Sequence, residues 1–520
     1  MSLPSHRTAG VLLPLFAIRD EGAWGIGALP ELGAIAPWLK QAGFSVLMLL
    51  PLLEAALGQD SPYSAQSAFA LDPVYLDIEA LEDFEELGGV GALGPDDRAC
   101  LERVRAAPRV DWAAVRTLKE KWLRRCFARF VASGAALDSA RERDLAAFRE
   151  AQADWLSDYV LFRALKEADR SSWWQRWDEP LRLRDPEALA AARARTAVDC
   201  AFFEYLQWQA QRQLAAARAE ARRHGVLLAG DLPFMVAEDS ADAWARQEEL
   251  RFDAKVGAPP DAYSEDGQDW GLPVYRWDLI ARAGYPWLRR RGVRTAEAFD
   301  LFRVDHAVGF YRTYVRPKDK SPASFSPATE KEELEQGEAI MRALASGGAG
   351  LLAEDLGTVP AFVRASLTLL GIPGFRVLRW EKEGEVFRDP ALWPALSVAA
   401  TGTHDTEPAA VWWEQLADDE RSALLRLRTF EGLSETATRF GSDVHRAILE
   451  AVYGSGSDLL ILPVQDLFGE RARINLPGTV SADNWSYRMP YSIADLSFEP
   501  RLRERTLELA ALARHHRRHG

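Results

Sequence analysis

Short runs of consecutive apolar residues recur along the chain, and most are followed by a segment with helical periodicity. Such runs are typical of parallel strands, which are buried on both faces. Eight of them, each followed by a helix, predict a (β/α)8 TIM barrel of the α/β class. The runs that we interpret as strands are Gly10–Ala17, Ser45–Leu52, Val226–Phe234, Phe299–Val304, Gly350–Ala353, Gly374–Trp380, Ser397–Ala400 and Asp458–Val464.

Between residues 94 and 224 the pattern changes to Ala, Arg, Glu and Leu at helical spacing. The periodicity predicts helices over Trp112–Ser133, Ala136–Lys166 and Pro186–His224. We therefore expect residues 1–93 to form the first part of the barrel, 94–224 a helical insertion, and 225–520 the rest of the barrel.

Charge and composition exclude several classes of protein. The 520 residues carry a net charge of −14, which argues against nucleic acid or an anionic membrane as a partner. The longest apolar run, residues 46–57, contains Pro51 and Glu54 and is too short to span a bilayer, and no secretion signal is evident. We expect a cytoplasmic protein, whose basic tail, Arg514–His519, is a frayed helix end rather than a binding arm.

Acidic residues follow three of the predicted strands. Asp305 lies between Arg303 and His306, Glu354 follows the next run, and a His404–Asp405 pair follows a third. The carboxyl ends of barrel strands meet at one mouth, so the three acids are expected to share a pocket. Any one of them alone could be a structural ion pair. Three carboxylates that repel one another indicate chemistry, and glycosidic-bond chemistry fits them best.

Two predicted loops reach the same mouth. One is the polar stretch Asp60–Phe69, and the other is a long irregular loop, 252–277, rich in Gly, Pro, Asp and aromatic residues. Loops of that length in a compact domain are usually functional. Only His306 and His404 of the eight histidines lie at predicted strand ends, and no metal-binding spacing accompanies them, so we expect no metal.

An ordered set of motifs extends from residue 60 nearly to the end of the chain, and as a set it is highly specific. It resembles the amylomaltases, also called 4-α-glucanotransferases or disproportionating enzymes, in the α-amylase-like clan of retaining glycoside enzymes. The motifs are DSPYSAQSAFA, GDLPFMVAEDSADAWA, KVGAPPDAYSEDGQDWGLPVYRW, FRVDHAVGF, LLAEDLGTVP, GTHD, QDLFGERARINLPGT and NWSYR.

The resemblance implies that Asp305 is the nucleophile, that Glu354 is the general acid/base, and that Asp405 binds sugar hydroxyls and favours distortion of the reacting ring. The residues agree with this, because a retaining mechanism needs two carboxylates about 5–5.5 Å apart. Arg303 lies on the same strand face as Asp305 and is expected to keep it ionised. The charges of Asp305 and Asp405 are expected to raise the pKa of Glu354.

The resemblance also implies a glucan-binding groove built partly from the two loops. His404 is expected to donate hydrogen bonds to the substrate, whereas His306 could do so or could pack behind the site. The remaining residues expected to bind substrate are Arg303, Ser61, Tyr63, Asp231, Asp261, Gln268, Trp270 and Asn475.

The resulting hypothesis is a 4-α-glucanotransferase that moves α-1,4-glucan segments between maltooligosaccharides, with no cofactor. The alternatives are a retaining α-glucan hydrolase on the same scaffold and a catalytically silent glucan-binding protein. The chain departs from the family pattern at Tyr311–Glu338 and at Thr406-Glu407-Pro408. Neither departure removes a catalytic carboxylate, and both concern the donor side of the groove.

Overall fold

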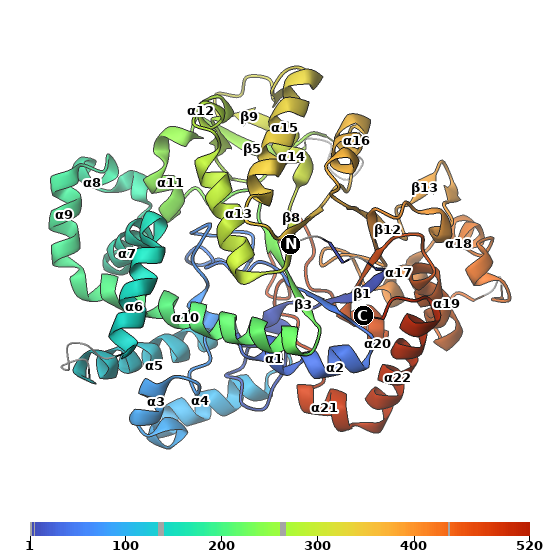
Figure 1. Ribbon diagram of the computed structural model, residues 1–520, viewed down its shortest axis with the longest axis horizontal. Helices are drawn as coiled ribbons and strands as arrows, with labels where there is room; N and C mark the ends of the chain where they lie inside the picture. The colour runs from blue at the N-terminus through green and yellow to red at the C-terminus, as the bar shows by residue number, and fades with distance from the viewer. Residues whose placement is uncertain (1–2, 5, 134–139, 261–266, 435–436, 520) are drawn as a thin grey trace.

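The computed structural model describes residues 3–4, 6–133, 140–260, 267–434 and 437–519. Its centre is a closed barrel of eight parallel strands in the order β1-β16-β15-β12-β11-β8-β3-β2 (Figure 1). The predicted TIM barrel is confirmed, and each strand lies within or overlaps a predicted run. The strands are β1 (Thr8–Leu12), β2 (Val46–Met48), β3 (Leu227–Leu232), β8 (Leu301–Val304), β11 (Gly350–Ala353), β12 (Gly374–Val377), β15 (Ser397–Ala400) and β16 (Leu459–Pro463).

The helices between β2 and β3 gather on one side of the barrel (Figure 1). Two predicted helices are each interrupted, one at Gln152 and one at Thr196, where the backbone leaves the helical conformation. Whether this segment folds as a separate subdomain stays a prediction. The helices between β2 and β3 are α3 (Glu82–Glu86), α4 (Pro95–Ala106), α5 (Trp112–Ser133), α6 (Ala140–Ala151), α7 (Ala153–Ala168), α8 (Glu179–Arg182), α9 (Pro186–Arg195) and α10 (Ala197–Arg223), of which α4 to α10 lie in the predicted insertion.

The remaining helices surround the barrel and follow its strands in the chain (Figure 1). They are α1 (Glu31–Ala34), α2 (Ala36–Gln41), α11 (Ala241–Ala245), α12 (Trp277–Arg282), α13 (Pro286–Ala298), α14 (Ala307–Tyr311), α15 (Glu330–Ala345), α16 (Ala361–Leu369), α17 (Ala409–Gln415), α18 (Asp418–Leu424), α19 (Ser442–Tyr453), α20 (Val464–Phe468), α21 (Ile493–Phe498) and α22 (Pro500–His515). None of the described helices is both long and apolar enough to cross a membrane.

The segment predicted as a long irregular loop, 252–277, is partly strand, so that prediction was wrong. A four-stranded sheet runs in the order β10-β9-β5-β6, and two of its strands come from the atypical segment 311–338. The pairing joins segments far apart in the sequence, which local patterning does not reveal. The strands outside the barrel are β4 (Leu250–Arg251), β5 (Ala254–Ala258), β6 (Gln268–Asp269), β7 (Val274–Tyr275), β9 (Thr313–Pro317), β10 (Ser324–Ser326), β13 (Lys382–Glu383) and β14 (Val386–Phe387).

The two ends of the chain meet where the barrel closes. β1 pairs with β16, and the Ala9 N–H donates to the carbonyl of Arg518 at 3.2 Å. The Arg518 side chain is buried and donates to the carbonyls of Tyr453 and Ser457, both at 2.7 Å. The expectation of a frayed basic tail was therefore wrong at this residue, because the arginine satisfies carbonyls that the barrel leaves unpaired.

Candidate active site

Three carboxylates lie beyond the carboxyl ends of barrel strands. Asp305 directly follows β8 and Glu354 directly follows β11. These strands are neighbours, and Val304 pairs with Ala353, so the two acids occupy equivalent positions side by side. Asp405 is carried by the turn after β15, one strand beyond β12. The closed barrel therefore brings the three predicted catalytic residues to one mouth.

Arg303 connects the carboxylates on this side of the mouth. Its guanidinium lies 2.9 Å from Asp305 and 2.7 Å from Asp231, and a second nitrogen lies 3.9 Å from Glu354. The expected contact between Arg303 and Asp305 is thus present. Arg303 thus places a buried positive charge directly beside the proposed nucleophile.

Glu354 lies in a different environment from Asp305. Burial raises the pKa of Glu354 to about 7, and the charge of Asp305 adds to the shift, while Arg303 opposes it. The main-chain N–H groups of His306 and Leu356 donate to this carboxylate at 2.9 and 3.0 Å. The expected contribution of the Asp305 charge is present, and desolvation is the largest cause of the shift.

Asp405 is the most open of the three acids, with 41% of its side chain exposed. The Asn475 amide donates to one oxygen of Asp405 at 2.7 Å, and His404 Nε2 lies 3.4 Å from the other. Asp405, Asn475 and His404 therefore form one polar surface at the mouth.

Tyr63 lies between this surface and the buried base of the site. Its ring stacks on His404 with centroids 5.3 Å apart, and its hydroxyl donates to Asp231 at 2.7 Å. Asp231 is enclosed, and both of its oxygens accept from Arg303. Asp231 thus holds Arg303 and Tyr63, and its expected contact with substrate stays a prediction.

His306 packs against Trp270, which belongs to the segment 252–277. Its ring lies edge-to-face with Trp270 at 4.7 Å and with Phe234 at 5.4 Å. Burial lowers the pKa of His306 to about 4, so the ring is neutral at physiological pH. Its backbone is left-handed, with φ of 44°, and a Cβ at position 309 would lie 2.3 Å from its ring, which explains Gly309. Of the two roles left open, these contacts favour packing.

The other predicted groove residues have uneven structural support. The Trp270 indole donates to the side chain of Gln268 at 3.0 Å, at the exposed edge formed by β6. Ser61 accepts a hydrogen bond from the Tyr63 N–H at 3.3 Å, so it shapes the loop that carries Tyr63. Asp261 lies outside the described residues. In the described part of the chain, no group of three or more His, Cys, Asp or Glu residues is arranged to hold a metal ion.

Comparison with known proteins assigns this constellation to a family. A family model described as 4-alpha-glucanotransferase matches residues 13–494. The chain belongs to the 4-α-glucanotransferase family. It is 35% identical to the 4-alpha-glucanotransferase of Thermus thermophilus over 507 residues, covering 94% of this chain and 95% of the relative. It is 31% identical to that of Chlamydia pneumoniae over 512 residues, covering 95% and 93%.

Solved structures give the same assignment. An amylomaltase from Streptococcus agalactiae in complex with acarbose matches with a TM-score of 0.83 at 25% identity, covering 99% of this chain and all of that one. The alignment of whole chains means that this 4-α-glucanotransferase family member and its relatives share the barrel and the helices around it.

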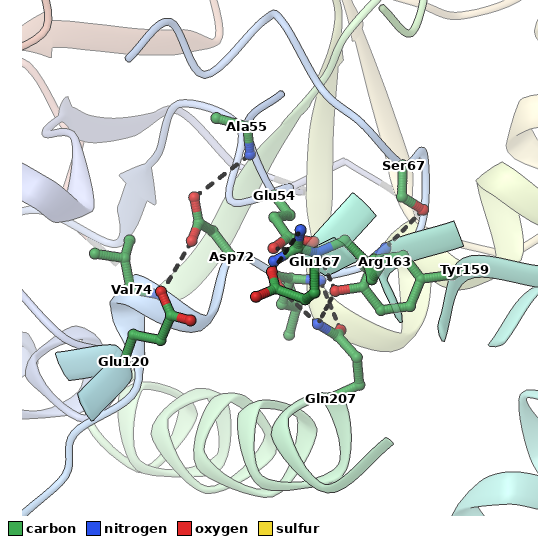
Figure 2. A network of polar contacts seen from close by, with 12 residues as sticks. Glu54, Ala55, Ser67, Asp72, Val74, Glu120, Tyr159, Arg163, Glu167 and Gln207 are labelled. Atoms are coloured by element: carbon green, nitrogen blue, oxygen red, sulfur yellow. Dashed lines mark hydrogen bonds and ion pairs between the residues drawn. The ribbon is translucent and has the colours of Figure 1, made fainter. Parts of the chain in front are cut away.

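In this family member, a buried polar network fixes the loop that carries Tyr63 (Figure 2). Glu54, which precedes the Asp60–Phe69 loop, accepts a hydrogen bond from the Tyr159 hydroxyl at 2.6 Å and forms an ion pair with Arg163 at 3.1 Å. Both partners are on α7. Gln207 on α10 donates to the carbonyl of Leu71 and accepts from its N–H, at 2.8 and 2.9 Å. Helices α7 and α10 thereby hold the chain on both sides of the loop.

Several residues near the carboxylates were not predicted. Trp485 lies 5.8 Å from Tyr63 and 5.9 Å from His404 between ring centroids, and completes an aromatic cluster. Arg473 donates to the carbonyl of Asp405 at 2.6 Å. Both lie inside motifs that carry the resemblance, NWSYR and QDLFGERARINLPGT. The sequence therefore marked these segments, but it did not show that the two side chains lie beside the carboxylates.

Proposed function

We propose that this chain transfers α-1,4-glucan segments between maltooligosaccharides by double displacement. The observation that carries the proposal is the contrast between two adjacent carboxylates. Asp305 lies 2.9 Å from a buried guanidinium, whereas burial raises the pKa of Glu354 to about 7. Neighbouring carboxyl groups in such different environments are suited to different roles, one as nucleophile and one as acid.

In the first step, the Asp305 carboxylate attacks the anomeric carbon of the donor and forms a glycosyl ester, with inversion. Glu354 gives its proton to the departing glycosidic oxygen, so the released sugar leaves with a free 4-hydroxyl. In the second step, Glu354 takes the proton from the 4-hydroxyl of an acceptor, which attacks the same carbon and breaks the ester to Asp305. The two inversions give net retention.

Asp405 and Asn475 supply the polar surface for the reacting ring. Asp405 is 41% exposed and has an oxygen held by Asn475 at 2.7 Å, which orients it toward the open mouth. A carboxylate there accepts hydrogen bonds from ring hydroxyls, and such bonds strengthen as the ring distorts toward the transition state.

The fate of the glycosyl ester separates a transferase from the hydrolase alternative. Transfer needs an acceptor sugar in place and water kept away. Trp270 packs on His306, the neighbour of Asp305, and Tyr63 stacks on His404, the neighbour of Asp405. These aromatic faces suit pyranose rings and favour an acceptor over water.

The test is incubation of the purified protein with maltotriose, with products separated over time. Transfer gives glucose together with maltotetraose and longer chains. Only glucose and maltose, with reducing ends rising in step, would mean hydrolysis and would overturn the proposal. Asp305→Asn is the control, because loss of all products in that variant excludes a contaminating enzyme. A wild-type protein without turnover would instead support the silent glucan-binding alternative.

A further inference from the structure

The turn that carries Asp405 contains Thr406-Glu407-Pro408, one of the two places where the chain departs from the family pattern. Thr406 closes the turn, since its hydroxyl donates to the carbonyl of Thr403 and accepts from the Thr403 N–H, both at 3.0 Å. A Cβ at Gly402 would lie 2.4 Å from that hydroxyl, so a glycine is needed there. The departure is therefore part of a tightly built turn.

Glu407 lies between two arginines from different parts of the barrel mouth. Arg379, two residues beyond β12, donates to the Glu407 carboxylate at 2.5 Å and to its carbonyl at 2.9 Å. Arg473 lies 3.4 Å from the other carboxylate oxygen. Only 4% of the Arg379 side chain is exposed, so Glu407 is fixed from behind by a buried cation.

Arg473 in turn holds the two main-chain segments that present the third catalytic acid. It donates to the carbonyl of Asp405 at 2.6 Å and to the carbonyl of Asn475 at 3.2 Å. The side chains of these same two residues bond to each other at 2.7 Å. The Arg473 guanidinium therefore holds the backbone of both Asp405 and Asn475, whose side chains face the reacting sugar in the proposed function.

We propose that Glu407 is a positioning residue for the reaction: through Arg473, it fixes the Asp405–Asn475 pair in the orientation that the transition state requires. The proposal rests on the role of Asp405 in the proposed function. Glu407 does not touch the sugar. Its effect comes from placing a group that does, and small misplacements of such groups cost large factors in rate.

The experiment is a double-mutant cycle with Glu407→Gln and Arg473→Gln, measuring kcat and KM for maltotriose. Glu407→Gln is expected to lower kcat about tenfold while KM stays within about twofold, because the lost interaction acts in the transition state. In the Arg473→Gln background, adding Glu407→Gln is expected to cost less than about twofold, because both changes release the same pair.

Glu414→Gln is the matched control. Glu414 also bridges to an arginine, Arg471, at 2.7 and 2.8 Å, but on α17 away from the carboxylates. Both kinetic constants are expected to stay within about twofold of wild type in this variant, because its ion pair is exposed. A wild-type kcat in Glu407→Gln, or a full additional tenfold loss in the Arg473→Gln background, would overturn the proposal.

Glu407→Gln removes the negative charge that pairs with the buried Arg379, so the stability of the variant must be measured as well. If thermal melting shows that Glu407→Gln is unfolded at the assay temperature, Glu407→Asp replaces it in the cycle. That variant keeps a negative charge near the buried Arg379 but draws the carboxylate back by one methylene, which weakens its contact with Arg473, and the same loss of kcat with unchanged KM is expected. A wild-type protein that hydrolyses maltotriose would contradict the proposed transfer but leave this cycle interpretable, since Asp405 serves both reactions.

Discussion

The main-chain N–H of His306 donates to the carboxylate of Glu354 at 2.9 Å. The residue that follows the proposed nucleophile thus holds the proposed acid/base. Glu354 begins the loop that follows β11, the neighbour of β8 in the barrel. The relative placement of the two carboxylates is consequently fixed by main chain and by Arg303, not by flexible side chains alone.

The pKa of Glu354 predicts the pH dependence of the reaction. Glu354 must be protonated to assist departure of the donor, and burial raises its pKa to about 7. We expect kcat/KM for maltotriose to fall above pH 7, approaching about tenfold per pH unit, because this ratio reports groups of the free enzyme. With α-maltosyl fluoride as donor, whose fluoride leaves without a proton, formation of the glycosyl ester should lose this alkaline limb. An alkaline limb common to both donors would contradict the assignment.

The same shift predicts a pH-dependent stability. The folded pKa of about 7 exceeds the ordinary value of 4.5, so the native state binds the proton more tightly. The associated stabilisation is present below pH 4.5 and is lost as pH rises through about 7, by up to about 3 kcal/mol. Glu354→Gln resembles the protonated form, so its melting temperature should exceed that of wild type at pH 8 but not at pH 5. Glu335→Gln, on the exposed face of α15, is the control and should show no such difference.

The covalent intermediate can be trapped. In Glu354→Gln the ester to Asp305 still forms from α-maltosyl fluoride, but no base remains to activate the acceptor. We expect mass spectrometry of a digest to find a maltosyl group on the peptide that contains Asp305. The double variant Asp305→Asn/Glu354→Gln should carry none. An adduct on the peptides of Asp231 or Asp405 would reassign the nucleophile.

The buried polar network around Glu54 and Arg163 predicts that a substitution away from the three carboxylates destabilises the fold. Glu54→Ala removes the closer of the two acids beside the buried Arg163 and leaves only Glu167, at 3.7 Å, so we expect a loss of up to about 3–5 kcal/mol. Chemical denaturation should show this loss. Where the variant is folded, KM for maltotriose should rise, because the loop carries Tyr63. Glu335→Ala removes the exposed pair with Lys331 and should change stability by less than about 1 kcal/mol. An equal, small effect of the two variants would mean that the buried pair does not anchor the loop.

Much of the barrel and its three acids could be predicted from the sequence, because strands buried on both faces appear as continuous apolar runs. The sheet that contains β5 and β9 could not, because its pairing partners are remote in sequence. The break at Gln152 was missed because Gln is a good helix former, and the break at Thr196 because a single Thr does not by itself end a helical pattern.

Burial determines two features of the site that the sequence does not show. One is that Arg303 and Tyr63 bond to the oxygens of Asp231. The other is that desolvation raises the pKa of Glu354 more than the expected charge of Asp305 does. Both depend on how atoms exclude water, which a list of residues does not contain.

The meeting of the chain ends has a consequence for how the protein is made. β1 is translated well before β16, which is one of its two partners in the barrel. The hydrogen bond from the Ala9 N–H to the carbonyl of Arg518 forms later still, because Arg518 follows β16 in the sequence. Because a chain is made from its N-terminus, this edge of β1 stays unpaired until residues 459–463 have been made. A chaperone that shields this edge should therefore matter most for nascent chains stalled short of residue 459.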